Sequence, residues 1–230
     1  MATHPLLLLH GALGAGTQYE PLLPLIADRI DVHTLDFEGH HKTPLRGRPL
    51  RFNHLAENVL DCMDHRSIDQ IHIFGHSLGG AIGLYLARHF PQRVASVFTL
   101  GIKFEWSPEI AEKENAFLDP EKMKQKVPGF AAMLQQRHTA AGWEPLLERV
   151  RDLHRSMGRD NPLKETDYRS ISQKVRIAVG DRDKMVDIEQ SKKVYHLLQQ
   201  GEFQVFPATP HPLEQVHMPR LASAILDFLG

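Results

Sequence analysis

Residues 71–81, which read Ile-His-Ile-Phe-Gly-His-Ser-Leu-Gly-Gly-Ala, decide the fold of this 230-residue chain. The apolar run at 71–74 predicts a buried strand, and a helical stretch follows at residues 79–90. Between the two lies a G-x-S-x-G pattern with Ser77 at its centre. In a strand–turn–helix context this pattern is a nucleophile elbow, a sharp and strained turn that presents the serine hydroxyl. Gly75 and Gly79 are required because larger side chains would collide across so tight a turn.

Short apolar runs alternate with helical stretches along the rest of the chain, which is typical of a parallel sheet built from strand–helix–strand units. Near-continuous apolar runs indicate strands that are buried on both faces. The expected helices cover residues 19–29, 55–66, 79–90, 188–199 and 220–228. The expected strands cover residues 5–9, 32–35, 71–74, 94–100, 175–179 and 202–206.

One region interrupts this alternation, because residues 103–172 contain no convincing strand. They are charged, amphipathic and helical in pattern. Prolines favour first helical turns and loops, so they divide the region into three or four helices, at Pro108, Pro120, Pro128, Pro145 and Pro162. We therefore expect a core of residues 1–102 and 173–230 with a helical lid, residues 103–172, inserted between core strands. The alternative is a solvated helical bundle with no role in substrate choice.

The overall composition excludes several classes of partner. A formal net charge of −1 argues against a nucleic-acid or anionic-membrane partner, which would need a basic face. Apolar content of 42% and charged content of 24% are ordinary for a soluble globular protein. No signal-peptide pattern or membrane-length apolar run occurs, so a cytoplasmic location is expected.

The cysteine and histidine content gives no support for a metal site. The single cysteine, Cys62, excludes an internal disulfide and a cysteine-rich zinc cluster, and it fits a reducing compartment. The 15 histidines are scattered and form no HExxH pattern. We expect neither a metal nor a cofactor.

A loop that follows the first expected strand supplies candidates for an oxyanion hole, the pair of amides that binds a developing negative charge. That strand ends in His10-Gly11-Ala12-Leu13. One donor is expected to be the amide of Leu78, directly after the nucleophile. The second is expected to be the amide of Ala12, with Leu13 as the alternative.

Loops after two later strands supply candidates for the acid and the base that activate the serine. In proteins with this elbow the chain order is serine, acid, histidine. Asp181 and Asp183 both follow the strand at 175–179, and Asp183 is preferred because it lies further beyond the strand end. His211 follows the last strand and is preferred to His217, which lies in or near the final helix. The predicted catalytic residues are Ser77, Asp183 and His211.

These motifs together resemble those of the α/β-hydrolase superfamily. The four matching stretches, in order, are His10-Gly11, Gly75-His76-Ser77-Leu78-Gly79, Gly180-Asp181-Arg182-Asp183 and His211-Pro212-Leu213-Glu214. Residues 36–43 also resemble the D-x-x-G-H-G-x-S loop of the family, but His41 stands where glycine is usual. The resemblance implies an α/β-hydrolase fold of about six mainly parallel strands rather than eight, because the sequence begins at the strand that carries His10. The role of the His40–His41 pair, structural or substrate-contacting, stays open.

The expected activity is that of a serine hydrolase that cleaves a small or medium carboxylic ester or thioester through an acyl-enzyme on Ser77. Phe104 and Trp106 follow the strand at 94–100 and are candidates for apolar walls of the substrate pocket, although they could equally be ordinary packing between lid and core. Two alternatives stay open. The same residues can serve carbon–carbon bond hydrolysis, lyase or perhydrolase chemistry, or the fold can be that of a non-catalytic small-molecule receptor.

Overall fold

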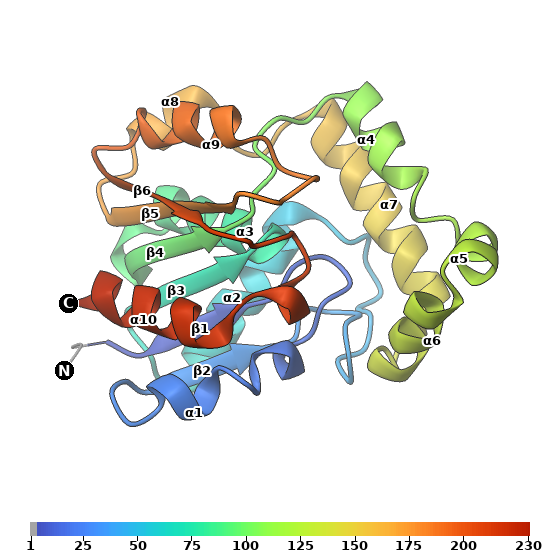
Figure 1. Ribbon diagram of the computed structural model, residues 1–230, viewed down its shortest axis with the longest axis horizontal. Coiled ribbons are helices and arrows are strands. Elements are labelled where there is room, and N and C mark those ends of the chain that lie inside the picture. Colours follow the sequence, from blue (N-terminus) through green and yellow to red (C-terminus); the bar gives the residue numbers. More distant parts are fainter. Residues whose placement is uncertain (1–3) are drawn as a thin grey trace.

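The computed structural model describes residues 4–230, whose strands form a single parallel sheet (Figure 1). The strands are β1 (Leu6–Leu9), β2 (Val32–Leu35), β3 (Ile71–His76), β4 (Val94–Leu100), β5 (Lys174–Gly180) and β6 (Gln200–Phe206). Their order across the sheet is β2-β1-β3-β4-β5-β6, and every neighbouring pair is parallel. The predicted sheet of about six mainly parallel strands is confirmed.

Helices cover both faces of this sheet (Figure 1). They are α1 (Leu23–Ile26), α2 (Phe52–His65), α3 (Leu78–His89), α9 (Ile188–Tyr195) and α10 (Met218–Leu229), with short 3-10 turns at Gly16–Tyr19, Pro91–Arg93 and Leu213–Gln215. Successive strand residues point to opposite faces, so Leu7 and Leu9 pack with α2 and α3. Leu6 and Leu8 pack instead with α1 and α10. Burial on both faces explains why the strands read as continuous apolar runs.

The strand order places the site at one end of the sheet. From β1 the chain crosses to β2 on one side and later to β3 on the other, so β1 and β3 flank a topological switch point. In open parallel sheets, ligands bind in the crevice outside the carboxyl ends of the strands at such a point. The loop at His10 and the turn at Ser77 both lie there.

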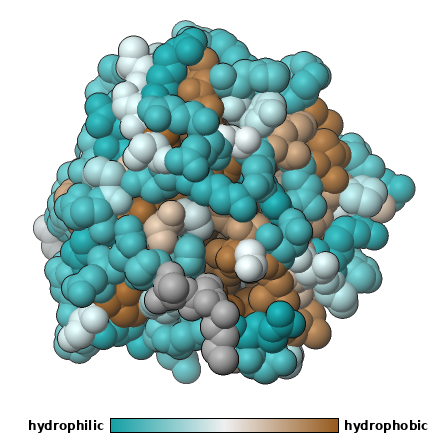
Figure 2. Space-filling view, turned by 90° about the vertical axis from the view of Figure 1, so that its left-hand side faces the viewer, coloured by the Kyte–Doolittle hydropathy of each residue, from teal (hydrophilic) through white to brown (hydrophobic). Residues whose placement is uncertain are grey.

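Five helices occupy the interval between β4 and β5: α4 (Pro108–Asn115), α5 (Pro120–Lys126), α6 (Pro128–Arg137), α7 (Trp143–Arg159) and α8 (Glu165–Arg169). Proline opens the first three of them, as the sequence indicates. Helices α4–α7 form a layer beyond the carboxyl ends of the strands (Figure 1). The face at the opposite end of the molecule is largely hydrophilic, with smaller apolar areas (Figure 2).

Two expectations about helices are wrong in detail. The fifth helix, α8, exceeds the predicted three or four, because Asp167 caps the amide of Lys164 and starts one more turn. It lies against α3, where Asp167 pairs with Arg88 at 3.1 Å, and not in the layer of α4–α7. The helix expected at 19–29 is reduced to the single turn of α1, because Pro21 and Pro24 lack the amide hydrogens that a longer helix needs.

In residues 4–230, no helix has both the length and the apolar composition that crossing a bilayer demands.

Candidate active site

Ser77 lies on the tight turn between β3 and α3. Its backbone has φ of 50° and ψ of −118°, a left-handed conformation that costs a non-glycine residue about 1–3 kcal/mol. Its amide donates to the Leu100 carbonyl at 2.8 Å, which ties the turn to the end of β4. Helix α3 begins at Leu78, so its amino terminus, with its partial positive charge, lies next to the serine.

The glycines that flank Ser77 are required by close contact with backbone. A β-carbon at Gly75 would lie 2.3 Å from the Gly80 nitrogen, and one at Gly79 would lie 2.3 Å from the Leu9 carbonyl oxygen. Neither contact is sterically possible. The G-x-S-x-G pattern is therefore the steric condition for this turn.

His211 and Asp183 meet beside this turn. The His211 Nδ1 and the Asp183 Oδ2 are 2.7 Å apart, and the two side chains are only 13% and 2% exposed. The other carboxylate oxygen of Asp183 accepts the amides of Met185 at 2.8 Å and Val186 at 3.1 Å. The carboxylate is thus fixed in direction, with one oxygen left for the histidine.

Asp181, the other candidate for the acid, contacts a loop amide and not the His211 ring. Its Oδ1 accepts the Thr209 amide at 3.0 Å and thereby shapes the loop that leads to His211. Hydrogen bonds from the amides of Ala208 and Thr209 lower the pKa of the Asp181 carboxyl. Of the two candidates for the acid, only Asp183 contacts His211.

His76, the residue before the serine, holds the His211 loop. Its Nε2 donates to the His211 carbonyl at 2.9 Å, and the two rings lie 5.0 Å apart. Burial, reinforced by the nearby His211 ring, lowers the pKa of His76 to about 4, so the ring is neutral near pH 7. The Ser77 hydroxyl and the His211 ring form no hydrogen bond in residues 4–230, and such pairs often close only in the substrate complex.

The loop after β1 lies directly against the serine. A β-carbon at Gly11 would be 3.1 Å from the Ser77 β-carbon, so this glycine permits the close approach. Leu13 has φ of 59°, and its amide donates to His40 Nε2 at 3.3 Å. The Leu13 amide is therefore engaged, which favours Ala12 of the two amides considered for the oxyanion hole.

The His10 side chain hydrogen-bonds within the same loop and links it to a second loop. Its Nδ1 donates to the Gly11 carbonyl at 2.8 Å, and its Nε2 accepts the Phe37 amide at 3.2 Å. Complete burial lowers the pKa of His10 to about 3, which keeps the ring neutral as these two bonds require. The His-Gly motif thus joins the β1 loop to the loop after β2.

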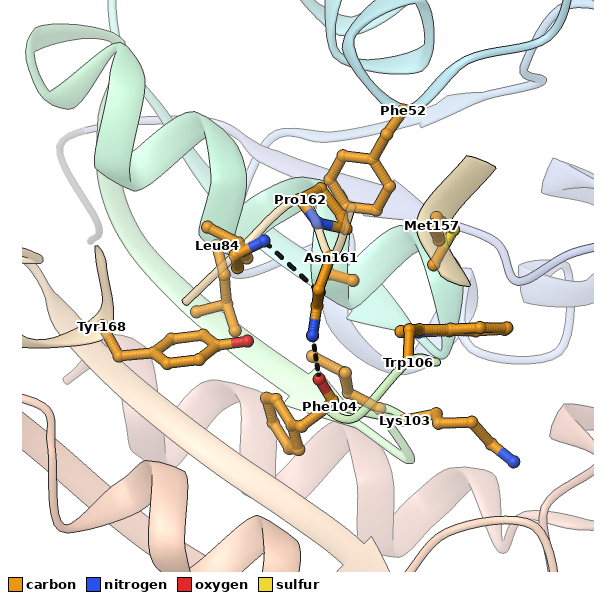
Figure 3. Close-up of a pocket in the computed structure, with 12 residues that line it drawn as sticks. Phe52, Leu84, Lys103, Phe104, Trp106, Met157, Asn161, Pro162 and Tyr168 are labelled. Carbon is orange, nitrogen blue, oxygen red and sulfur yellow. Dashed lines mark hydrogen bonds between the residues drawn. The ribbon is translucent and has the colours of Figure 1, made fainter. Parts of the chain in front are cut away.

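Phe104 and Trp106 line a cavity between α3 and the inserted helices (Figure 3). Ala81 and Ile102 also line it; Ala81 lies one helical turn beyond Ser77, and its amide donates to the Ser77 carbonyl. The Tyr168 hydroxyl points into the same space (Figure 3). The cavity is therefore mainly apolar and adjoins the serine turn.

This cavity is small in the present structure. Its free space, part of which opens to solvent, is about 250 Å³, below the roughly 300–1,000 Å³ of typical ligand pockets. The charged side chains near the cavity already have partners in the protein. Lys103 pairs with Glu114, and Glu105 accepts a hydrogen bond from Gln190 Nε2 at 3.0 Å. A ligand larger than this space needs side chains or inserted helices to move.

Three contributors to the site have no motif in the sequence. Gly101, at the end of β4, has φ of 71°, and a β-carbon there would lie 3.2 Å from Asp183 Oδ2 and 3.3 Å from His211 Nδ1. Arg137 and His138, at the end of α6, donate to the Leu13 carbonyl. A glycine directly after a strand was a usable signal for Gly101, whereas nothing local marks Arg137 or His138. In residues 4–230, no three His, Cys, Asp or Glu side chains are grouped to hold a metal ion.

Comparison with known proteins agrees with this architecture. Residues 4–171 match the model of a family described as alpha/beta hydrolase fold. A structure described as a hydrolase from Pseudomonas aeruginosa superposes with a TM-score of 0.79, covering 100% of this chain and 91% of that one at 19% identity. At this identity the likeness concerns the fold alone.

Two curated relatives match part of the chain. One is the dihydrolipoyllysine-residue acetyltransferase component of an acetoin cleaving system from Pseudomonas putida, 38% identical over 93 residues, which are 40% of this chain and 25% of the relative. The other is a pyrethroid hydrolase from Sphingobium wenxiniae, 38% identical over 104 residues, 44% of this chain and 36% of the relative. The chain therefore matches well under half the length of either relative.

Proposed function

Because the chain belongs to the α/β-hydrolase fold family, we propose that it is a serine hydrolase that cleaves a small or medium carboxylic ester or thioester through an acyl-enzyme on Ser77. The observation that carries the proposal is the 2.7 Å contact between His211 and Asp183 beside the strained turn of Ser77. A serine hydroxyl becomes a good nucleophile only when a histidine takes its proton, and the carboxylate keeps that histidine in the correct tautomer. The similarity to a pyrethroid hydrolase supports hydrolysis as the type of reaction.

In acylation, Ser77 Oγ attacks the substrate carbonyl carbon while its proton passes to His211 Nε2. Asp183 accepts the Nδ1 proton of His211 in its hydrogen bond and stabilises the imidazolium that forms. The carbonyl oxygen becomes an oxyanion, which the amides of Ala12 and Leu78 bind at the amino terminus of α3. When the intermediate collapses, the alkoxide or thiolate leaves with the proton from His211, and the acyl group stays on Ser77.

Deacylation repeats these steps with water as the nucleophile. His211 takes a proton from the water as the oxygen attacks the acyl carbon, and it then returns the proton to Ser77 Oγ as the acid leaves. The same oxyanion hole serves both tetrahedral intermediates. Neither step draws on a metal or cofactor.

Helices α4–α7 act as the lid in this proposal, and the cavity lined by Phe104 and Trp106 takes the apolar part of the substrate. The cavity begins one helical turn from Ser77, at Ala81. Its small size favours a short acyl group in the closed form, and movement of the lid admits a longer one. The substrate is thus a small molecule with an apolar group next to its ester or thioester carbonyl.

Labelling with a fluorophosphonate probe tests the nucleophile. The wild-type protein should form one covalent adduct at Ser77, and Ser77→Ala should form none. Replacing Ser170, a serine outside the site, by alanine controls for nonspecific loss of labelling. If the wild-type protein stays unlabelled, or if Ser77→Ala is labelled equally, the nucleophile assignment is wrong.

A panel of p-nitrophenyl esters and acyl thioesters, graded by acyl chain length, tests the substrate class. We expect turnover that is highest for short chains and abolished in Ser77→Ala. Binding without turnover of any member identifies a receptor. Labelling at Ser77 without ester or thioester turnover points to carbon–carbon bond hydrolysis, lyase or perhydrolase chemistry by the same residues.

A further inference from the structure

The carbonyl group of Leu13 is held by two residues of the helical insertion. Arg137 Nη1 donates to it at 3.1 Å and His138 Nε2 at 3.0 Å, across sequence separations of 124 and 125 residues. The amide of the same residue is held from a third segment, by His40 Nε2 at 3.3 Å. Both polar groups of the Leu13 backbone are thus bonded to parts of the chain outside its own loop.

These bonds maintain an unfavourable backbone conformation. Leu13 has φ of 59°, which a branched apolar side chain adopts only where its surroundings impose it. The Leu13 side chain is 7% exposed, so it is packed as well as hydrogen-bonded. The peptide unit directly before Leu13 carries the Ala12 carbonyl, and the Ala12 amide, the proposed second donor of the oxyanion hole, lies in the next unit towards the amino terminus. A change of backbone conformation at Leu13 would therefore also displace the Ala12 amide, one peptide unit away.

His41, in the core, forms hydrogen bonds to the part of the insertion that contains Arg137 and His138. It stands with φ of 51° where the family usually has glycine, and it makes four bonds to the end of α6 and the residues after it. Its amide donates to His138 Nδ1 at 3.0 Å, and its Nδ1 donates to the Arg137 carbonyl at 3.0 Å. Its carbonyl accepts the amides of Thr139 at 3.0 Å and Ala140 at 3.2 Å. Three of these bonds use the backbone of His41, and the departure from glycine adds the fourth, from the side-chain Nδ1 to the Arg137 carbonyl.

Arg137 also reaches the loop of the catalytic histidine. Its Nη2 pairs with Glu214 Oε1 at 2.5 Å, and Gln18 Nε2 donates to the same oxygen at 2.8 Å. Glu214 lies three residues after His211. The Arg137 side chain is 13% exposed and that of Glu214 is 43% exposed, so solvent screens the pair on the carboxylate side and its main effect is to fix the direction of the guanidinium. One guanidinium therefore bridges the oxyanion loop and the His211 loop.

We propose that Arg137 and His138 are positioning residues that hold the oxyanion-hole amide of Ala12 in place. The site is then complete only when the lid helices are packed against the core. This inference rests on the proposed serine hydrolase function. It assigns the lid a part in transition-state stabilisation in addition to covering the pocket. It also gives His41 a docking role, not a substrate-contacting one.

Steady-state kinetics on a short-chain p-nitrophenyl ester provide the first test. Removing one oxyanion donor lowers kcat by about 100- to 1,000-fold, so a displaced donor in the double variant Arg137→Met/His138→Leu should lower it at least about 10-fold. KM should stay within about threefold, because the lost interaction is made mainly in the transition state. Arg137→Met/His138→Gln keeps a donor near the Nε2 position of His138 and should have a clearly higher kcat than Arg137→Met/His138→Leu.

The matched control is Arg155→Met, which removes another lid arginine. In residues 4–230, Arg155 pairs with Glu112 and Asp152 inside the insertion and forms no hydrogen bond or ion pair with the oxyanion loop. It should leave both kcat and KM unchanged. A loss of kcat in this variant equal to that of the double variant would overturn the inference, because it would indicate general lid damage.

Amide hydrogen exchange gives a second readout that does not depend on activity. The amides of residues 13–15 are hydrogen-bonded, to His40, Gly11 and Gln18 respectively. They should exchange faster in Arg137→Met/His138→Leu and at the wild-type rate in Arg155→Met. Unchanged exchange in the double variant overturns the inference, as does faster exchange with an unchanged kcat.

The two readouts also separate this inference from the proposed function. If the wild-type protein is not labelled at Ser77 and turns over no ester, the proposed function fails. Faster exchange in the double variant then still supports the hold of the lid on the loop. If labelling and turnover are present and the double variant loses neither protection nor kcat, only the inference fails.

Discussion

At the scale of single residues, the orientation of hydrogen-bonding groups distinguishes neighbouring candidates that the sequence ranks only by their position after a strand. Asp181 and Asp183 are two positions apart, and both follow β5. The carboxylate of Asp181 turns back to the Thr209 amide, whereas that of Asp183 points to His211. The same reasoning separates Ala12 from Leu13, because only the Leu13 amide is engaged by His40.

Replacement of each aspartate by asparagine tests the choice of acid. In the proposed mechanism, Asp183→Asn removes the charge that stabilises the His211 imidazolium and favours the wrong tautomer, so kcat should fall by about 10³- to 10⁴-fold. Asp181→Asn keeps an oxygen that accepts the Thr209 amide, and its kcat should stay within about tenfold of wild type. Hydrolysis of a short-chain ester measures both. The opposite ranking would mean that Asp181 is the acid.

Gly101 is the residue whose substitution should disturb the Asp183–His211 pair most directly. Gly101→Ala places a methyl group 3.2 Å from Asp183 Oδ2 in a backbone conformation with φ of 71°. We expect kcat to fall at least about tenfold and stability to drop by about 1 kcal/mol or more. Gly129→Ala is the control, since a β-carbon there has no neighbour within 4 Å and Gly129 lies in α6. A Gly101→Ala variant with wild-type kcat would contradict this account.

At the scale of elements, the inserted helices are readable from the sequence but their placement is not. Prolines at the first positions of α4, α5 and α6 mark the starts of these helices. Nothing in those residues indicates that the last turn of α6 lies on the loop after β1, or that α8 lies on α3. These contacts join segments more than 75 residues apart, as in the pair Arg88–Asp167 with its separation of 79 residues.

The cavity beneath the insertion should set the acyl-chain preference. Trp106→Leu removes part of the cavity wall, so the ratio of kcat/KM for a longer-chain ester to that for a short-chain ester should rise by about 10-fold, the scale of one or two methylene groups in an apolar pocket. Trp143→Leu makes the same change at the other tryptophan, which does not line this cavity. It should leave the ratio unchanged. Equal ratios in both variants would exclude this cavity as the acyl site.

At the scale of the whole molecule, several neutral histidines are buried in and around the site. Burial lowers the pKa of His10 to about 3 and those of His76 and His138 to about 4, and it also lowers the pKa of His40. Well above pH 6.5 these rings are neutral in both the folded and the unfolded chain, so there they contribute no pH dependence. Between pH 6.5 and about 4 the unfolded chain binds protons that the folded chain excludes, and stability falls as the pH falls.

Urea unfolding at pH 7, 6 and 5 measures this effect. The free energy of unfolding should fall towards pH 5, with each excluded proton contributing up to about 1.4 kcal/mol per pH unit. His76→Gln removes one of these rings while keeping a donor for the His211 carbonyl, so its pH slope should be shallower. His65→Gln, which removes an exposed ring, measures the effect of the substitution itself. A slope that His76→Gln leaves unchanged would contradict the assignment of a neutral buried His76.

The sequence by itself determined the parallel sheet of six strands and the turn at Ser77. Both follow from local rules, namely the burial of apolar runs and the collision of any side chain at Gly75 or Gly79 with neighbouring backbone. Only the tertiary structure decided that Asp183 and not Asp181 meets His211, that Gly101 borders this pair, and that Arg137 and His138 hold the carbonyl of Leu13. The physical reason is the large sequence separation between the residues that make these contacts. A hydrogen bond between residues 124 positions apart depends on how whole helices pack, and packing is summed over many weak contacts that no short stretch of sequence encodes.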